Sequence, residues 1–182
     1  SYSANVSSDG RYVSFISNAT NLVTNAVSAG YHVYLRDVLA GLTRLVDANT
    51  NGIGGTDDWG TVPVLSSNGQ FVGFCSFDAS LVAADYNNTY DVFLRDVMAG
   101  ETELISQRSP EMIPVAGNTL SVMGPFSISA DGSRVAFSSY ASNLVANDFN
   151  NERDVFVRDL QAGSTLLVSV GINGQAEGPM EI

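Results

Sequence analysis

One six-residue segment occurs three times in this chain and constrains its fold more than any other feature. The copies are 32–37 (HVYLRD), 91–96 (DVFLRD) and 154–159 (DVFVRD), and each is an apolar, partly aromatic run that ends in Arg-Asp. An Asp-Gly or Asn-Gly pair precedes each copy, and its glycine stands 26 residues before the repeated arginine every time. An internal distance kept three times predicts a repeat architecture, which has to be recognised before single elements are assigned.

Each repeat holds four short segments with the composition and periodicity of β-strands. Their apolar residues are mainly β-branched or aromatic and alternate with polar ones, and glycine-containing turns separate them. No stretch keeps apolar residues at positions i, i+3 and i+4 for long enough to predict a helix. Strands are expected at 1–7, 11–17, 31–38, 42–47, 61–66, 71–76, 91–97, 101–106, 125–129, 134–139, 154–160 and 164–169.

Repeated four-stranded antiparallel meanders predict an all-β protein built from β-propeller blades. One meander cannot bury both of its faces, whereas stacked meanders shield one another. Small residues at equivalent positions, Ser14, Gly73 and Ala136, are expected where a neighbouring blade approaches. The alternative is a series of β-sandwiches, but a unit of about 60 residues is small beside the ~100 residues of such a domain. The three blades are expected at about 1–47, 60–106 and 124–170 of a single propeller segment, 1–182.

The end of the sequence matches the start of the third repeat. Residues 178–182 (GPMEI) align with 124–128 (GPFSI), so 171–182 are expected to begin a fourth blade. Three blades do not close a ring that normally needs four to eight. We therefore expect a larger propeller or one completed by a partner chain, since open blades expose apolar faces and a strand edge.

The third repeat resembles a known family of repeats. The residues that carry the resemblance are 129–137 (SADGSRVAF), 143–145 (NLV), 148–150 (DFN) and 154–159 (DVFVRD). They are similar to the TolB-like, WD40-like (PD40) β-propeller repeats of bacterial envelope and secreted proteins, and the similarity extends through all three copies. The resemblance implies a binding or scaffolding module, in some members attached to an enzyme. It also implies an extracellular, cell-surface or periplasmic location.

Composition limits the classes of partner. The 182 residues are 45% hydrophobic and 15% charged, as in globular proteins, and the formal charge is −11. All eight cationic side chains are arginines, which argues against nucleic acid and anionic membrane surfaces. No apolar run approaches the ~18 residues of a membrane span. The acidic surface suits metal cations, basic partners or simple solubility. The single cysteine, Cys75, lies in an apolar run and is expected to be a buried thiol.

Two loops have the spacing Asp-x-Asn-x-x-x-Asp just before the repeated Arg-Asp strand. This spacing gathers hard oxygen ligands on a short loop, which is the chemistry that Ca²⁺ prefers. With two carboxylates per loop, the expected dissociation constant is in the range of about 10⁻⁴ to 10⁻³ M. Asx-turns that only hold the loop are the alternative. The expected metal ligands are Asp85, Asn87, Asp91, Asp148, Asn150 and Asp154.

The first repeat departs from this pattern, with Ala26, Ser28 and His32 at the three positions, so its loop is expected to bind no metal. His32 is the only histidine, and a Ser-His-Asp triad would need it beside a nucleophile. No catalytic residue is assigned, and no carboxylate pair stands out as a glycosidase site. The acidic and aromatic segment 57–59, which comprises Asp57, Asp58 and Trp59, is a candidate ligand-binding loop, with a packed acidic turn as the alternative.

The Arg-Asp pairs recur in every unit, which favours a structural role over recognition. The function expected overall is a non-enzymatic extracellular or periplasmic propeller that serves as a binding or assembly scaffold, with calcium as a stabilising ion. Its partners would be a protein, a glycan or further copies of itself. The alternatives are a self-assembling cell-surface or filament subunit completed by neighbouring chains, and a non-catalytic or partial propeller of a secreted hydrolase.

Overall fold

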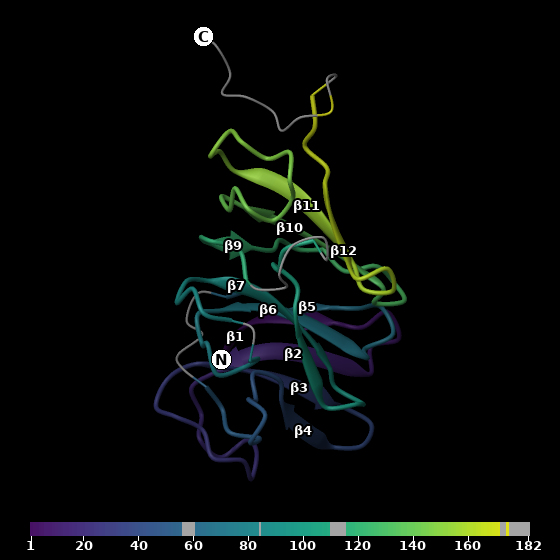
Figure 1. The fold of residues 1–182 in the computed structure, drawn as a ribbon. Helices are drawn as coiled ribbons and strands as arrows, with labels where there is room; N and C mark the ends of the chain where they lie inside the picture. Colours follow the sequence, from purple (N-terminus) through teal and green to yellow (C-terminus); the bar gives the residue numbers. More distant parts are fainter. Residues whose placement is uncertain (56–60, 84, 110–115, 172–173, 175–182) are drawn as a thin grey trace.

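Three antiparallel sheets, each a four-stranded meander, make up the part of the chain described by the computed structural model, which is residues 1–55, 61–83, 85–109, 116–171 and 174. In these residues every regular element is a strand, as the sequence predicts (Figure 1). None of them forms a helix that is long and apolar enough to cross a membrane.

We call the sheets the first, second and third blades. The first blade consists of β1 (Tyr2–Val6), β2 (Tyr12–Ser17), β3 (His32–Asp37) and β4 (Leu42–Leu45). The second consists of β5 (Val64–Leu65), β6 (Phe71–Ser76), β7 (Asp91–Asp96) and β8 (Glu101–Leu104). The third consists of β9 (Ser121–Val122), β10 (Arg134–Ser139), β11 (Asp154–Asp159) and β12 (Ser164–Leu167). Within each blade the strands pair in sequence order.

The two central strands of every blade pair in the same register. An aromatic residue of one strand lies opposite an aromatic residue of the other, and the two rings are stacked with their centroids 5.6 to 5.7 Å apart. Cross-strand aromatic pairs of this kind stabilise a sheet beyond the area they bury. The pairs are Phe15–Tyr34, Phe74–Phe93 and Phe137–Phe156.

The first strand of the third blade does not lie where the sequence predicts it. The expected strand at 125–129 is reduced to a single bridge between Ile128 and Val135, and β9 lies earlier in the chain. Phe126 has a left-handed backbone, with φ of 60°. The Ser127 hydroxyl also donates to the Gly124 carbonyl oxygen at 2.6 Å. This local turn interrupts the extended conformation that a strand requires.

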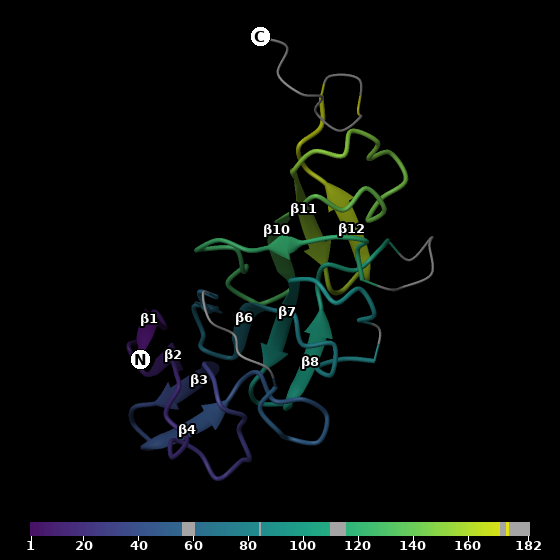
Figure 2. The same ribbon diagram turned by 90° about the vertical axis from the view of Figure 1, so that its left-hand side faces the viewer.

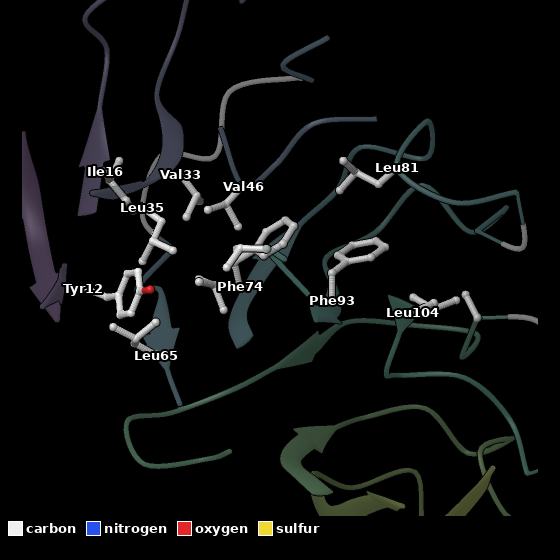
Figure 3. Close-up of a cluster of buried hydrophobic side chains, with 13 residues drawn as sticks. Tyr12, Ile16, Val33, Leu35, Val46, Leu65, Phe74, Leu81, Phe93 and Leu104 are labelled. Atoms are coloured by element: carbon white, nitrogen blue, oxygen red, sulfur yellow. The ribbon is translucent and has the colours of Figure 1, made fainter. Parts of the chain in front are cut away.

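The blades stack face to face, with the second blade between the other two in both views (Figures 1 and 2). Figure 3 shows the first interface, where Ile16 and Val33 of the first blade face Phe74 and Phe93 of the second. The second interface repeats it one blade further on. There the second blade contributes Cys75, Val92, Leu94 and Ile105, and the third contributes Val135, Phe137, Leu144 and Phe156.

Glycine turns let neighbouring blades approach closely. Tyr12 of the first blade lies over Gly69 of the second, and Phe71 of the second lies over Gly132 of the third. A Cβ at Gly73 would lie 2.6 Å from the terminal methyl of Met123, which confirms the close approach expected at this small residue. The same contact between blades is therefore built twice from equivalent positions.

Candidate functional sites at the open faces and acidic loops

The outer face of the third blade is apolar, and none of the described residues covers it. Val92 and Ile105 of the second blade are 0% exposed because the third blade packs on them. Their equivalents in the third blade, Val155 and Val168, are 42% and 52% exposed, and the nearby Leu166 is 58% exposed. Full burial of such a side chain stabilises by about 1.5–3 kcal/mol. This surface, which we call the third-blade open face, therefore repeats the side of the second blade that packs on the third.

The opposite end of the stack presents the complementary surface. Phe74 and Leu81, which meet the preceding blade, are almost fully buried, whereas their first-blade equivalents Phe15 and Leu22 are only partly buried. Gly10, the turn glycine of the first blade, has no atom within 4 Å of the place where a Cβ would lie. We call this the first-blade open face.

The two open faces carry opposite charges at their edges. Arg134 occupies the position at which Tyr12 and Phe71 cover the turn of the next blade. Its side chain is 65% exposed, and its Nε donates to Asp159 at 3.1 Å. Asp9, beside the uncovered Gly10, is an exposed carboxylate. The hydrogen bond that it accepts from the Ser7 hydroxyl lowers its pKa. The third-blade open face therefore carries a cation where the first-blade open face carries an anion.

The acidic loop of the second blade brings its predicted ligands together. Asp85 and Asp91 are both buried, and the Asp85 charge is among the causes that raise the pKa of Asp91, so the carboxylates lie within interaction range. The Ser106 hydroxyl donates to Asp91 Oδ1 at 2.5 Å. The Asn87 side chain interacts with Asp91 as well. Asp85 Oδ2 and Asp91 Oδ2 have no hydrogen-bond partner in the described part of the chain.

The acidic loop of the third blade repeats this arrangement. Asp148 and Asp154 are each 2% exposed, and the Ser169 hydroxyl donates to Asp154 Oδ1 at 2.5 Å. Asp148 Oδ1 and Asp154 Oδ2 lack a hydrogen-bond partner among the described residues. We call Asp91 and Asp154, the second aspartate of each loop, the inner aspartates. One oxygen of each inner aspartate accepts a hydrogen bond from a serine, and the other has no hydrogen-bond partner among the described residues.

Burial raises the pKa of carboxyl groups in both loops. It raises the pKa of Asp91 to about 7, and the Asp85 charge adds to the rise while hydrogen bonds from Ser106 and Asn87 oppose it. Burial also raises the pKa of Asp85. In the third blade, burial and then the charge of Asp154 raise the pKa of Asp148. Both loops thus hold carboxylates whose charged forms are poorly solvated.

Asx-turns are present in the same loops. Asp85 Oδ1 accepts from the Asn87 N–H, and the Asn87 Oδ1 accepts from the Thr89 N–H at 2.9 Å. Asn88 and Asn151, at equivalent positions, both have left-handed backbones with φ of 52° and 55°, which asparagine tolerates. These turns shape the loop through Asp85 Oδ1 and Asn87 Oδ1. Asp85 Oδ2 and Asp91 Oδ2 take no part in them.

The first blade replaces the inner aspartate by histidine. His32 Nδ1 lies 2.6 Å from Asp47 Oδ2, and both side chains are 1% exposed. His32 Nε2 lies 3.3 Å from both the hydroxyl and the carbonyl oxygen of Ser28. The Ser28 hydroxyl itself donates to the Gly55 carbonyl oxygen at 2.5 Å. Although these are the residue types of a catalytic triad, the serine proton points to Gly55, and the geometry suits a ring that donates from both nitrogens.

Sequence reasoning missed the partners of the inner position. Asp47, Ser106 and Ser169 occupy the same place after the fourth strand and contact His32, Asp91 and Asp154 respectively. The repeat offsets of 59 and 63 residues could have revealed this triplet, because each partner follows the repeated segment at the same distance.

The Arg-Asp pairs make the structural contacts expected of them. Asp37 Oδ1 accepts from the N–H groups of Leu39 and Ala40, which holds the turn after β3. Arg36 donates to Thr43 on the adjacent strand, and the same bond recurs in the other blades.

Among the described residues, no group of three or more His, Cys, Asp or Glu side chains is arranged to hold a metal ion. The candidate ligands Asp57, Asp58 and Trp59, and most of the expected fourth-blade segment 171–182, lie outside the described residues.

Solved structures of β-propeller proteins are similar to this chain, whereas sequence comparisons find no match. No family model matches the sequence, so the PD40 repeat is not confirmed as such, and no curated protein matches it. Among solved structures, TolB from Acinetobacter baumannii is 15% identical with a TM-score of 0.52, over 91% of this chain and 31% of that one. A putative TolB from Agrobacterium tumefaciens is 13% identical with a TM-score of 0.55, over 92% and 47%. The β-propeller domain of the Trilobed protease from Pyrococcus furiosus is 9% identical with a TM-score of 0.52, over 91% and 40%.

At such low identity these similarities establish the fold alone. The three sheets are blades of a β-propeller, as the sequence predicts. The chain spans between 31% and 47% of the length of these structures, so its blades correspond to part of a propeller.

Proposed function

We propose that this chain is a non-enzymatic binding or assembly scaffold that acts through its two open blade faces. One observation carries the proposal: Val155 and Val168 are about half exposed, although their equivalents Val92 and Ile105 are completely buried by the next blade. A surface already built to pack on a blade gains free energy when a comparable apolar surface covers it.

The same chain carries both halves of a blade interface, which favours assembly with further copies as a second candidate function. The third-blade open face of one copy matches the first-blade open face of another. Arg134 on one side would then lie near Asp9 on the other, and opposite charges steer association and set its register. A closed propeller ring normally holds four to eight blades, so the three described blades need further ones to close it. Closure would leave no open face.

Sedimentation velocity over a wide concentration range tests both candidates. We expect the native chain to associate as its concentration rises and Val168→Asp to stay monomeric, because a charge would be buried in the contact. Leu39→Asp is the matched control, since Leu39 is 79% exposed on a β3–β4 turn away from the blade faces. A chain that stays monomeric would refute assembly between copies. Glycan-array and pull-down binding by the native chain but not by Val168→Asp would then support the broader scaffold, and binding by neither would refute it.

The non-enzymatic part of the proposal has its own test. The arrangement of Ser28, His32 and Asp47 is the group in the described residues that most resembles a catalytic apparatus. A fluorophosphonate probe labels an activated serine, and we expect no labelling of Ser28. Labelling that disappears in His32→Ala would instead favour the remaining alternative, a propeller with hydrolase activity.

The location proposed is extracellular, cell-surface or periplasmic. The lysine-free acidic composition and the resemblance to repeats of envelope and secreted proteins support it. Fractionation of cells that express the full-length gene, followed by immunoblotting, would test this location.

A further inference from the structure

Four carboxylate oxygens, two in each acidic loop, are buried without a hydrogen-bond partner. They belong to side chains that are 0–3% exposed. A buried carboxylate oxygen that accepts no hydrogen bond loses its hydration and gains nothing in return, which makes it strongly unfavourable when ionised. The same loss occurs twice at equivalent positions, so it is a property of the repeat. The oxygens are Asp85 Oδ2, Asp91 Oδ2, Asp148 Oδ1 and Asp154 Oδ2.

The first blade shows what is missing from the other two. Its inner position carries His32 and the partner position carries Asp47, so a carboxylate is still present but faces an imidazole 2.6 Å away. A ring that donates from both nitrogens is a cation, and its contact with Asp47 Oδ2 offsets the charge of that carboxylate from within the chain. The second and third blades have serine at the partner position and no such internal donor for the orphaned oxygens. A bound cation would supply what these two loops lack.

We propose that the acidic loops of the second and third blades are two binding sites for a hard divalent cation, with calcium as the ion. The proposed ligands are Asp85, Asn87 and Asp91 in the second blade and Asp148, Asn150 and Asp154 in the third. Calcium accepts carboxylate and amide oxygens in irregular geometry and completes its shell with carbonyl groups and water. Magnesium demands near-octahedral geometry and gives up its water reluctantly, so it binds such sites less well.

The amide of the middle residue keeps accepting capacity in the second blade, although its N–H side also interacts with Asp91. Asn87 Nδ2 donates to the Gly117 carbonyl oxygen at 2.7 Å, which leaves Asn87 Oδ1 to accept. That oxygen accepts one bond, from the Thr89 N–H, and keeps a lone pair. Asn87 also lines an open pocket of about 190 Å³. Arg108 lines the same pocket, but no ion pair joins it to Asp85 or Asp91.

Thermal unfolding with calcium, magnesium or chelator, at constant ionic strength, is the first test. With a dissociation constant near 10⁻³ M, about 10 mM calcium lowers the unfolding equilibrium constant roughly tenfold per site. Two sites would raise the Tm by about 5–10 °C in a chain of this size. Magnesium should raise it less.

Substitutions make the test specific, because the expected effect changes sign with calcium. In chelator, Asp85→Asn with Asp148→Asn should be at least as stable as the native chain, since each removes one of two like charges. In calcium the native chain should be the more stable. Asp131→Asn is the matched control, because its carboxylate is exposed and bonded to Ser129 and Ser133, and it should keep the full calcium response.

Terbium luminescence distinguishes the two loops. Tyr86 and Tyr90 flank the ligands of the second-blade loop, whereas Phe149 and Arg153 occupy those positions in the third. Tyrosine-sensitised emission should therefore disappear in Asp85→Asn and largely remain in Asp148→Asn. Calorimetry should give two calcium ions per chain, and one in either variant. The proposal is overturned if calcium does not raise the Tm, if the double variant responds like Asp131→Asn, or if terbium emission is the same in both single variants.

Discussion

Replacement of Gly69 by alanine tests whether the blades are held together by the turn contact between them. Gly69 has a φ of 74°, and a Cβ there would lie 2.2, 2.7 and 3.0 Å from Cδ2, Cγ and Cβ of Tyr12. These atoms lie at the root of a buried ring and cannot move aside freely. Gly10 is the matched control, because its φ is 72° and nothing lies within 4 Å of its Cβ position.

The two substitutions share one cost and differ in another. A left-handed backbone costs a non-glycine residue about 1–2 kcal/mol, which both variants lose. Overpacking adds about 1–3 kcal/mol in Gly69→Ala only. We therefore expect Gly10→Ala to lower the free energy of unfolding by about 1–2 kcal/mol, and Gly69→Ala to lower it by about 2–5 kcal/mol.

Urea unfolding of both variants, at a protein concentration where the chain is monomeric, measures this difference, provided that the m-value is unchanged. The same substitution in a Tyr12→Ala background completes a double-mutant cycle, in which the extra cost of Gly69→Ala should vanish because the ring is gone. Equal losses for Gly69→Ala and Gly10→Ala, or an excess that survives removal of the Tyr12 ring, would refute the reasoning. If a second copy covers the first-blade open face, Gly10→Ala should also weaken association at high concentration.

Three further outcomes follow from burial and charge. Val92→Ala should lower the free energy of unfolding by about 2 kcal/mol through lost methyl burial and a cavity, whereas Val155→Ala should cost under about 1 kcal/mol; equal costs in monomeric protein would contradict the open face. Hydrogen bonds from Arg11 and then the Ala40 N–H lower the pKa of Asp37 from 3.8 to about 2. Its stabilisation is therefore complete above pH 3.8 and lost as the pH falls towards 2, so the Tm of Asp37→Asn should change less than that of the native chain between pH 4 and 2. Cys75, 8% exposed, should react with a thiol reagent only as fast as the chain opens, and rapid reaction under native conditions would show that its interface is not closed.

The central strands could be predicted from local pattern almost to the residue. β6 and β10 begin and end where alternation and turn residues place them, at 71–76 and 134–139. Alternation works here because one face of a strand meets the preceding blade and the other meets the next. The first strand of the third blade could not be placed in this way. The sequence of 125–129 looks like a strand, but Phe126 has a left-handed backbone that its residue type does not predict.

The acidic loops were identifiable by residue type, but their burial was not. Aspartate is normally exposed, and nothing local to 85–91 indicates that both of its carboxylates are buried. Their depth results from the packing of the loop between β6 and β7 and from Ser106, which reaches Asp91 because the third and fourth strands of the blade pair. The His32–Asp47 contact has the same origin in the first blade.

The repeat, the strand order and the residue types of the loops were determined by the sequence alone, because they depend on spacing and composition within one unit. Tertiary structure decided which surfaces are covered. Val92 and Val155 occupy the same place in the same motif, yet one is 0% and the other 42% exposed. Local sequence cannot distinguish them, since burial is set by whether another blade lies against the strand and not by the strand itself.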